Sequence, residues 1–245
     1  MNKAKKIGVL SLLAMMLVGC SCSKVDETTY EKAVNVYDTT DGINFSRVET
    51  ITVADEDIYT RKKITAGYLF DSNKNVKEME YIITTYKMST AGSSISNNVV
   101  KYYYSLDKQT LYTQESSVER YKETNVTYNE KFNINVSEGD QMLMIVGNFA
   151  PIFKLNEVSE FTITKNNGKA EVSFLAVCPN YESCSSNSEL IKYNYVIGES
   201  GTIESLTYDI VIGDTTHNIK YTFHSYGSNN VVISFPNDLE SYIEK

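Results

Sequence analysis

Apolar and polar residues alternate with a period of two through most of the chain after residue 40. Alternation of this kind is typical of strands that bury one face. The clearest case spans 202–212, where one face carries Leu206, Tyr208, Ile210 and Ile212. The pattern predicts further strands over 48–54, 58–70, 77–88, 98–105, 109–114, 117–128, 160–164, 170–177, 189–197, 217–226 and 230–235. The chain is therefore expected to be mainly β.

Short polar segments between these strands predict hairpin turns. The segments are Asn166–Lys169, Glu199–Gly201 and Gly227–Asn229, and glycine next to asparagine or serine is a strong turn signal. The last of them would pair 217–226 with 230–235. The longer segment 89–98 is rich in Ser, Asn and Gly and is expected to be a mobile loop.

The segment that follows the predicted tether has helical rather than strand periodicity. Tyr30, Ala33, Val34 and Tyr37 form one stripe of a helix that Thr28 or Thr29 would cap. The run Pro236-Asn237-Asp238 predicts either the start of a short terminal helix through Tyr242 or a tail.

The segment 137–154 is apolar with little alternation. Ser137 or Asp140 could cap a helix there, and Pro151 would end or bend it. A core helix is one interpretation. The other is the lining of an adaptable hydrophobic pocket, because flexible Met and large Phe side chains suit such a site. The pocket candidates are Met142, Met144, Phe149 and Phe153.

The first nineteen residues read as an export signal. Three lysines within 1–6 precede an apolar run over 7–18, which is shorter than the roughly 20 residues a spanning helix needs. The run ends in Leu17-Val18-Gly19-Cys20, which resembles the lipobox of bacterial lipoproteins. The resemblance implies cleavage before Cys20 and a lipid on its sulfur, and more than one acyl chain makes such an anchor stable. An ordinary signal peptide is the alternative.

These boundaries predict a signal over 1–19, a lipidated tether over 20–27 that includes Cys22, and one β-rich domain over 28–245. The signal holds three of the 23 basic residues and none of the 31 acidic ones. The mature chain therefore has 20 basic and 31 acidic residues, a net charge of −11. Such a chain has no basic surface for nucleic acid. Its 19 tyrosines and nine phenylalanines favour a sheet.

Cys178 and Cys184 enclose a five-residue polar segment. Outside the cytoplasm this spacing predicts a disulfide, and two free thiols are the alternative. Zinc is disfavoured because CxxC spacing is absent and no histidine lies nearby in sequence.

Motifs for catalysis or cofactor binding are absent, so no enzyme, catalytic residue, metal or cofactor is predicted. His217 and His224 fall on opposite faces of one strand and cannot share a metal; each is expected at the surface or at a strand end. Asp55–Asp57 is either a solvated turn or a weak calcium candidate. The tyrosine runs, such as Tyr102–Tyr104, are either a sugar-stacking platform or cross-strand pairs within a sheet.

The order helix, strands, apolar segment, strands and the ending formed by 221–227 and 231–236 resemble the LolA/LppX-type lipoproteins. That resemblance implies an antiparallel curved sheet or unclosed β-barrel with a few covering helices. It also implies a membrane-anchored, extracytoplasmic protein that binds or carries a hydrophobic, lipid-like ligand. The anchor would lie in the cell membrane, or in the outer membrane if the host has one. A non-catalytic interaction or structural lipoprotein with an envelope protein as partner is the alternative.

Overall fold

The computed structural model describes residues 22–92, 94–119, 128–133, 150–178 and 189–244. These residues form one helix, three 3-10 turns and one sheet. The helix is α2 (Cys22–Thr39), and the turns are η1 (Leu155–Glu157), η2 (Ser228–Asn230) and η3 (Leu239–Ser241). The strands are β1 (Gly42–Val53), β2 (Ile58–Phe70), β3 (Val76–Ser89), β4 (Ser94–Ser105), β5 (Thr110–Glu119), β6 (Tyr128–Asn133), β7 (Ser159–Asn166), β8 (Lys169–Val177), β9 (Leu190–Ile197), β10 (Ile203–Ile212), β11 (Thr215–Tyr226) and β12 (Ile243–Glu244).

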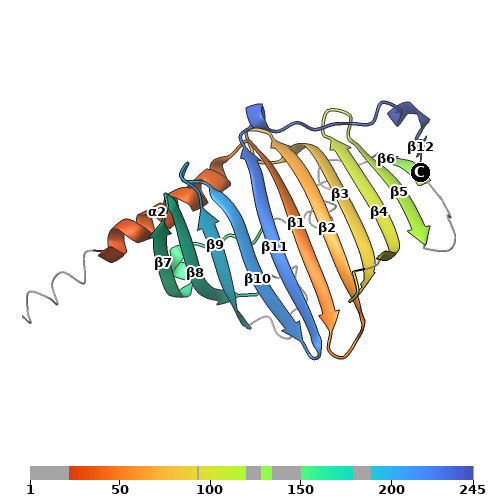
Figure 1. Cartoon of the computed structure of the whole chain (residues 1–245). Helices are drawn as coiled ribbons and strands as arrows, with labels where there is room; N and C mark the ends of the chain where they lie inside the picture. The colour runs from red at the N-terminus through yellow and green to blue at the C-terminus, as the bar shows by residue number, and fades with distance from the viewer. Residues whose placement is uncertain (1–21, 93, 120–127, 134–149, 179–188, 245) are drawn as a thin grey trace, which may run out of the picture.

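The sheet consists of two meanders that meet in its middle. The strand order among the described residues is β12-β6-β5-β4-β3-β2-β1-β11-β10-β9-β8-β7. All neighbouring pairs are antiparallel except β12 with β6. β7 and β12 lie at opposite ends of this order, so the curved sheet is not closed (Figure 1). The expected mainly β, antiparallel and unclosed architecture is confirmed.

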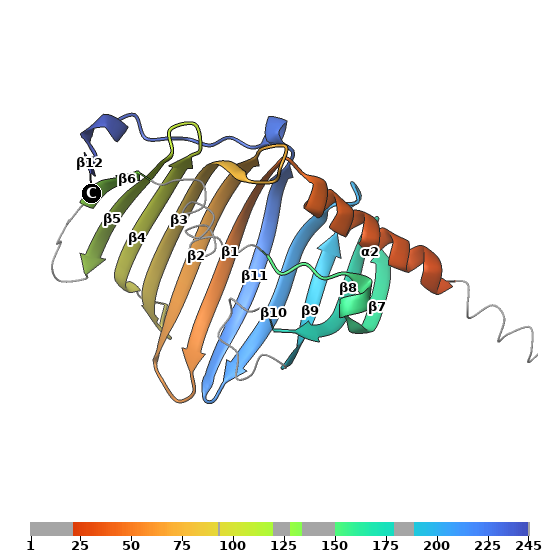
Figure 2. The same ribbon diagram turned by 180° about the vertical axis from the view of Figure 1, so that it is seen from behind.

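The helix α2 lies across one face of the second meander, in front of β7–β11 in Figure 2. Its predicted stripe is confirmed, because Tyr30, Ala33 and Val34 are buried and Tyr37 packs on the core. The Tyr37 ring meets Phe223 edge-on at 5.9 Å between centroids. We call the face of the sheet against which α2 packs the inner face. Phe45 of β1 is the Cα partner of Phe223 and belongs to the same face.

Alternation on the inner face explains why these segments are strands. In β10, Leu206, Tyr208 and Ile210 are at most 2% exposed, while the residues between them face outward. The predicted turn between β7 and β8 is also confirmed. Asn167 and Gly168 both have positive φ, at 48° and 77°, as a two-residue type I′ turn requires.

The predicted final hairpin is wrong. β11 pairs with β10 on one side and with β1 on the other, which leaves no edge for residues 230–235. At Gly227 (φ 85°) the chain turns out of the sheet, and Ser228 then donates its backbone N–H and its hydroxyl to the Asp41 carboxylate, each at 2.7 Å. The pairing of β11 with β1 is a long-range contact, which local sequence patterns cannot predict.

The chain after Gly227 instead crosses the outer face of the first meander (Figure 1). Val231 is buried there, and a Cβ on Gly67 would lie 2.9 Å from the Ile233 side chain. Further on, Phe235 packs on Tyr103, and Tyr242 meets Tyr112 edge-on at 5.7 Å. The short helix expected over 236–242 is the single turn η3.

Three other boundaries differ from the sequence prediction. The loop expected over 89–98 is much shorter, because β3 continues to Ser89 and β4 starts at Ser94. The two strands expected over 109–128 are one strand through Glu119, since its register with β4 continues unbroken past Glu115. The helix begins at Cys22 rather than at Thr28, so part of the expected tether is helical.

Candidate functional site

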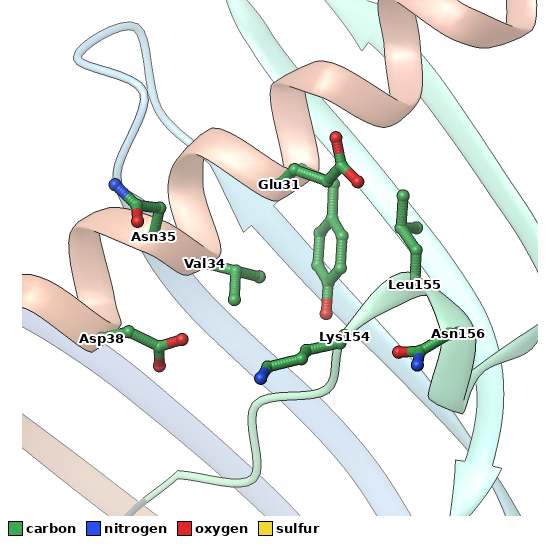
Figure 3. A pocket seen from close by; sticks show the side chains of 8 residues that line it. Glu31, Val34, Asn35, Asp38, Lys154, Leu155 and Asn156 are labelled. Atoms are coloured by element: carbon green, nitrogen blue, oxygen red, sulfur yellow. The ribbon is translucent and has the colours of Figure 1, made fainter.

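A groove lies between α2 and the chain that follows Ala150 (Figure 3). Its volume is about 440 Å³. Val34 and Leu155 supply apolar walls from opposite sides, and the side chains of Asp38 and Lys154 project toward its other end (Figure 3). The complete lining is Tyr30, Glu31, Val34, Asn35, Asp38, Lys154, Leu155 and Asn156.

A second groove of about 320 Å³ lies near the C-terminal end of the same helix. Its lining is Tyr37, Asp38, Thr40, Phe70, Lys74, Ala150 and Ile152, so the two grooves share Asp38. The Lys74 ammonium donates to the carbonyls of Thr39 and Thr40 at 2.6 and 2.7 Å. This cation satisfies carbonyls at the end of the helix, where a positive charge is favoured.

Two tyrosine hydroxyls hold the segment 150–155, which we call the strap. Tyr30 of α2 donates to the Phe153 carbonyl at 2.8 Å, and Tyr195 of β9 donates to the Pro151 carbonyl at 2.5 Å. Burial raises the pKa of Tyr30 well above its ordinary value, so its hydroxyl remains a donor. The helix and the sheet therefore fix the strap between them, and the strap forms one wall of each groove.

Aromatic rings fill the inner face beneath α2. Tyr30 meets Phe174 and Tyr195 edge-on at 5.6 and 5.8 Å between centroids. Tyr193 packs on Tyr208 at 4.9 Å, and all five side chains are at most 2% exposed. Tyr193 of β9 and Tyr208 of β10 therefore form a cross-strand pair within the core, and Tyr102 of the run 102–104 pairs across the strands with Tyr81. These pairs agree with the second of the two interpretations given above.

A charged cluster interrupts the inner face where the two meanders meet. Arg47 donates from Nη1 to Glu49 Oε2 at 3.0 Å, and His217 Nδ1 lies 2.8 Å from Glu49 Oε1. The Arg47 guanidinium also lies over the Tyr221 ring, at 5.7 Å from the centroid. The Arg47 and Glu49 side chains are only 2% and 9% exposed.

The environment of Glu49 favours its ionised form. Burial by itself raises the pKa of this carboxyl, but the Arg47 charge and the hydrogen bond to His217 outweigh burial and hold the pKa below its ordinary value. A charged carboxylate at the centre of the sheet thus links β1 to β11.

The fold is similar to those of solved structures whose sequence identity to this chain is low. No protein-family model and no curated protein matches the sequence. The fold is similar to that of the lipoprotein LppX from Mycobacterium tuberculosis, with 9% identity and a TM-score of 0.42 over 87% of this chain and 100% of that one. It is also similar to LprF from Mycobacterium bovis, with 11% identity and a TM-score of 0.44 over 88% and 97% of the two chains.

Of the four pocket candidates from the sequence, only Phe153 lies within the described residues. Its ring packs on Tyr193 at 4.9 Å and meets Phe174 edge-on at 5.9 Å, so it contacts the aromatic core. Met142, Met144 and Phe149 lie outside the described residues, as does most of the helix expected over 137–154. Residues 150–154 are not helical. A role of these four side chains in ligand binding stays a prediction.

The cysteine predictions also stay open. Cys20 and Cys184 lie outside the described residues, whereas Cys178 is 6% exposed at the end of β8. The described part of the chain contains no helix long and apolar enough to cross a membrane.

The two histidines lie on opposite faces of β11, as their spacing predicted. His224 contacts the Ser46 hydroxyl at 3.1 Å on the outer face, whereas His217 contacts Glu49 on the inner face. His217 lies near the start of β11, as expected of a strand-end residue, but its contact with the buried Glu49 carboxylate was not predicted. The turn Asp55–Asp57 is exposed, and within the described ranges no group of three potential metal ligands occurs.

The Arg47–Glu49–His217 cluster was not predicted, although the sequence positions of Arg47 and Glu49 indicate part of it. Phe45, Arg47 and Glu49 are alternate residues of one strand and therefore point to the same face, which places two charges on an otherwise apolar face. The missing information was the pairing of β1 with β11, which brings in a histidine 168 residues away.

Proposed function

We propose that this chain is a non-catalytic lipoprotein, anchored outside the cytoplasm through Cys20, that binds a hydrophobic, lipid-like ligand. The observation that carries the proposal is the pair of grooves on either side of the strap and α2. Volumes of about 440 and 320 Å³ fall in the range of roughly 300–1,000 Å³ typical of small-molecule sites.

The composition of the grooves supports an amphiphile rather than a polar metabolite. Their walls include Val34, Leu155, Phe70 and Ile152, while charged groups such as Asp38 and Lys154 stand beside these walls. An apolar chain would gain free energy by covering the walls, at about 25 cal/mol per Å² removed from water. The strap is the element expected to adjust, because residues 150–154 belong to neither a helix nor a strand.

The second candidate function is that of an interaction or structural lipoprotein with an envelope protein as partner. The packed rings under α2 favour it, because they fill the inner face of the second meander with the protein's own side chains. A solid core has no need of a ligand for its stability.

Native mass spectrometry of the mature chain carrying Cys20→Ser separates these two functions. A ligand-binding protein isolated from its host should carry co-purified lipid that organic solvent removes. A single mass equal to that of the polypeptide, unchanged after incubation with lipid extract, would favour the interaction function and contradict ligand binding.

A further inference from the structure

A hollow of about 320 Å³ lies at the β7 end of the sheet, and we call it the β7 hollow. Three neighbouring strands, β7, β8 and β9, supply its walls. It shares no residue with the two grooves beside α2. Its volume falls within the range of roughly 300–1,000 Å³ that is typical of small-molecule sites. The complete lining is Glu160, Phe161, Thr162, Ser173, Phe174, Leu175 and Lys192.

A β-bulge in β7 shapes one wall of the β7 hollow. The register of β7 with β8 shifts by one residue between Ser159 and Thr162. Of the two residues inside the bulge, Phe161 stacks on Phe174 at 6.4 Å between centroids, whereas Glu160 is exposed and has a φ of 53°. Residues other than glycine rarely adopt such a conformation, and those that do are concentrated at functional sites. The bulge therefore places a carboxylate at the rim of the hollow.

Opposite charges stand on two sides of the β7 hollow. Glu160 comes from β7 and Lys192 from β9, with β8 between them. Both residues are exposed, and within the described part of the chain neither makes an ion pair shorter than 4 Å. The outward-facing acid of β10, Asp209, accepts a hydrogen bond from Asn218 at 2.8 Å instead. Two strand spacings amount to about 10 Å, so a ligand with a cation at one end and an anion at the other meets both charges.

Hydroxyl groups and an apolar side chain lie between these two charges. Leu175 of β8 is the Cα partner of Lys192 and points to the same face. The hydroxyls of Thr162 and Ser173 lie 2.8 Å apart. Each hydroxyl can donate one hydrogen bond and accept two, so the pair keeps capacity for a ligand after bonding to each other. A peptide unit supplies one donor and one acceptor that match this capacity.

We propose that the β7 hollow binds a short peptide with free ends, about three residues long. The α-ammonium lies at Glu160, the α-carboxylate at Lys192, and an apolar side chain of the peptide covers Leu175. An extended peptide of three residues spans about 10 Å, which matches the two strand spacings between the charges. The site does not depend on the lipid-like ligand proposed for the grooves beside α2.

The test is isothermal titration calorimetry with the tripeptide alanyl-leucyl-alanine, with its N-acetylated form and with its C-amidated form. The protein is the mature chain with Cys20→Ser, alone and with Glu160→Gln or Lys192→Met. The matched controls are Glu171→Gln on β8 and Lys220→Met on β11, because both residues are exposed and neither lines the hollow. Circular dichroism melting checks that each variant is folded.

Acetylation or amidation of the tripeptide is expected to weaken binding to the parent chain about tenfold or more, the scale of a hydrogen bond to a charged group. Glu160→Gln is expected to bind the free tripeptide as weakly as the parent chain binds the acetylated one, and acetylation should then cost nothing more. Lys192→Met is expected to show the same relation to amidation. Both control variants should bind all three peptides like the parent chain.

Any of three results would overturn the proposal. The first is no binding of the free tripeptide by the parent chain. The second is equal binding of the free and the capped peptides, or equal losses in Glu160→Gln and Glu171→Gln, since the charges of the hollow would then not hold the peptide ends. The third is free leucine that binds as tightly as the tripeptide, because the ligand would then be an amino acid.

Discussion

Glu49 illustrates how single residues on this sheet depend on their partners. A buried ion pair adds little net stability compared with apolar residues, because both charges lose their hydration. Removing one partner is different, since it leaves the other charge buried without compensation. Without Glu49, the charge of Arg47 would be buried and uncompensated, because its side chain is only 2% exposed.

Glu49→Gln is therefore expected to lower the free energy of unfolding by about 3–5 kcal/mol, as measured by urea denaturation. The control is Glu204→Gln, which breaks a solvent-exposed pair with Lys169 that is even closer, at 2.6 Å. Exposed pairs of this kind contribute about 0–1 kcal/mol. Similar small losses in both variants would show that the Arg47–Glu49 pair is not desolvated.

The lowered pKa of Glu49 predicts a pH dependence of stability. Because the folded-state pKa lies below the unfolded one, Glu49 contributes its full stabilisation above the unfolded pKa, ordinarily 4.5. That contribution is lost as the pH falls through the folded-state value. The parent chain should therefore lose more melting temperature than Glu49→Gln between pH 6 and acid pH. Equal losses of melting temperature in the two proteins would contradict the lowered pKa of Glu49, because all other carboxylates are common to both.

At the scale of elements, the sequence predicted what depends on local periodicity. The bounds of β2, the Asn167-Gly168 turn and the stripe of α2 all follow from short-range patterns. The union of β1 with β11 does not, because it joins strands more than 160 residues apart. The grooves also depend on long-range contacts, because they lie between α2 and the strap, which are more than 100 residues apart in the chain. The groove residues therefore could not be identified from the sequence, and Phe153, the one strap residue named as a pocket candidate, packs on the aromatic core instead.

The strap is expected to loosen when its hydrogen bond from the helix is removed. Tyr30→Phe keeps the ring but leaves the Phe153 carbonyl without this donor, which should cost about 1–3 kcal/mol of unfolding free energy. Tyr242→Phe is the matched control, because the buried Tyr242 hydroxyl has no hydrogen-bond partner among the described residues. That change should be neutral or slightly stabilising. Equal losses in the two variants would show that the Tyr30 hydroxyl does not hold the strap.

At the scale of the whole molecule, the proposed lipid anchor on Cys20 determines where the domain lies relative to the membrane. Cys22, two residues after the proposed lipidation site, already belongs to α2, so the fold would start close to the membrane surface. A domain of net charge −11 would be repelled by anionic lipid headgroups, which leaves the lipid on Cys20 as the membrane contact.

Cys20→Ala is expected to abolish labelling by a fatty-acid probe and to shift the protein from the membrane to the soluble fraction. Cys22→Ala, two residues further on, should retain both labelling and membrane association. Labelling that persists in Cys20→Ala would contradict the lipobox assignment.

The proposed disulfide is tested by non-reducing peptide mapping of protein exported by its native host. A linked peptide pair containing Cys178 and Cys184 is expected. Free thiols at both positions would contradict the prediction.

Photo-crosslinking with an uncharged, diazirine-bearing long-chain alcohol tests ligand binding beside α2 most directly. The account predicts that labelled peptides map to residues 30–40 and 150–156, and that Leu155→Glu, which places a charge in the groove wall, reduces the labelling. Absence of specific labelling, or labelling confined to surfaces distant from α2 and unaffected by Leu155→Glu, would contradict it.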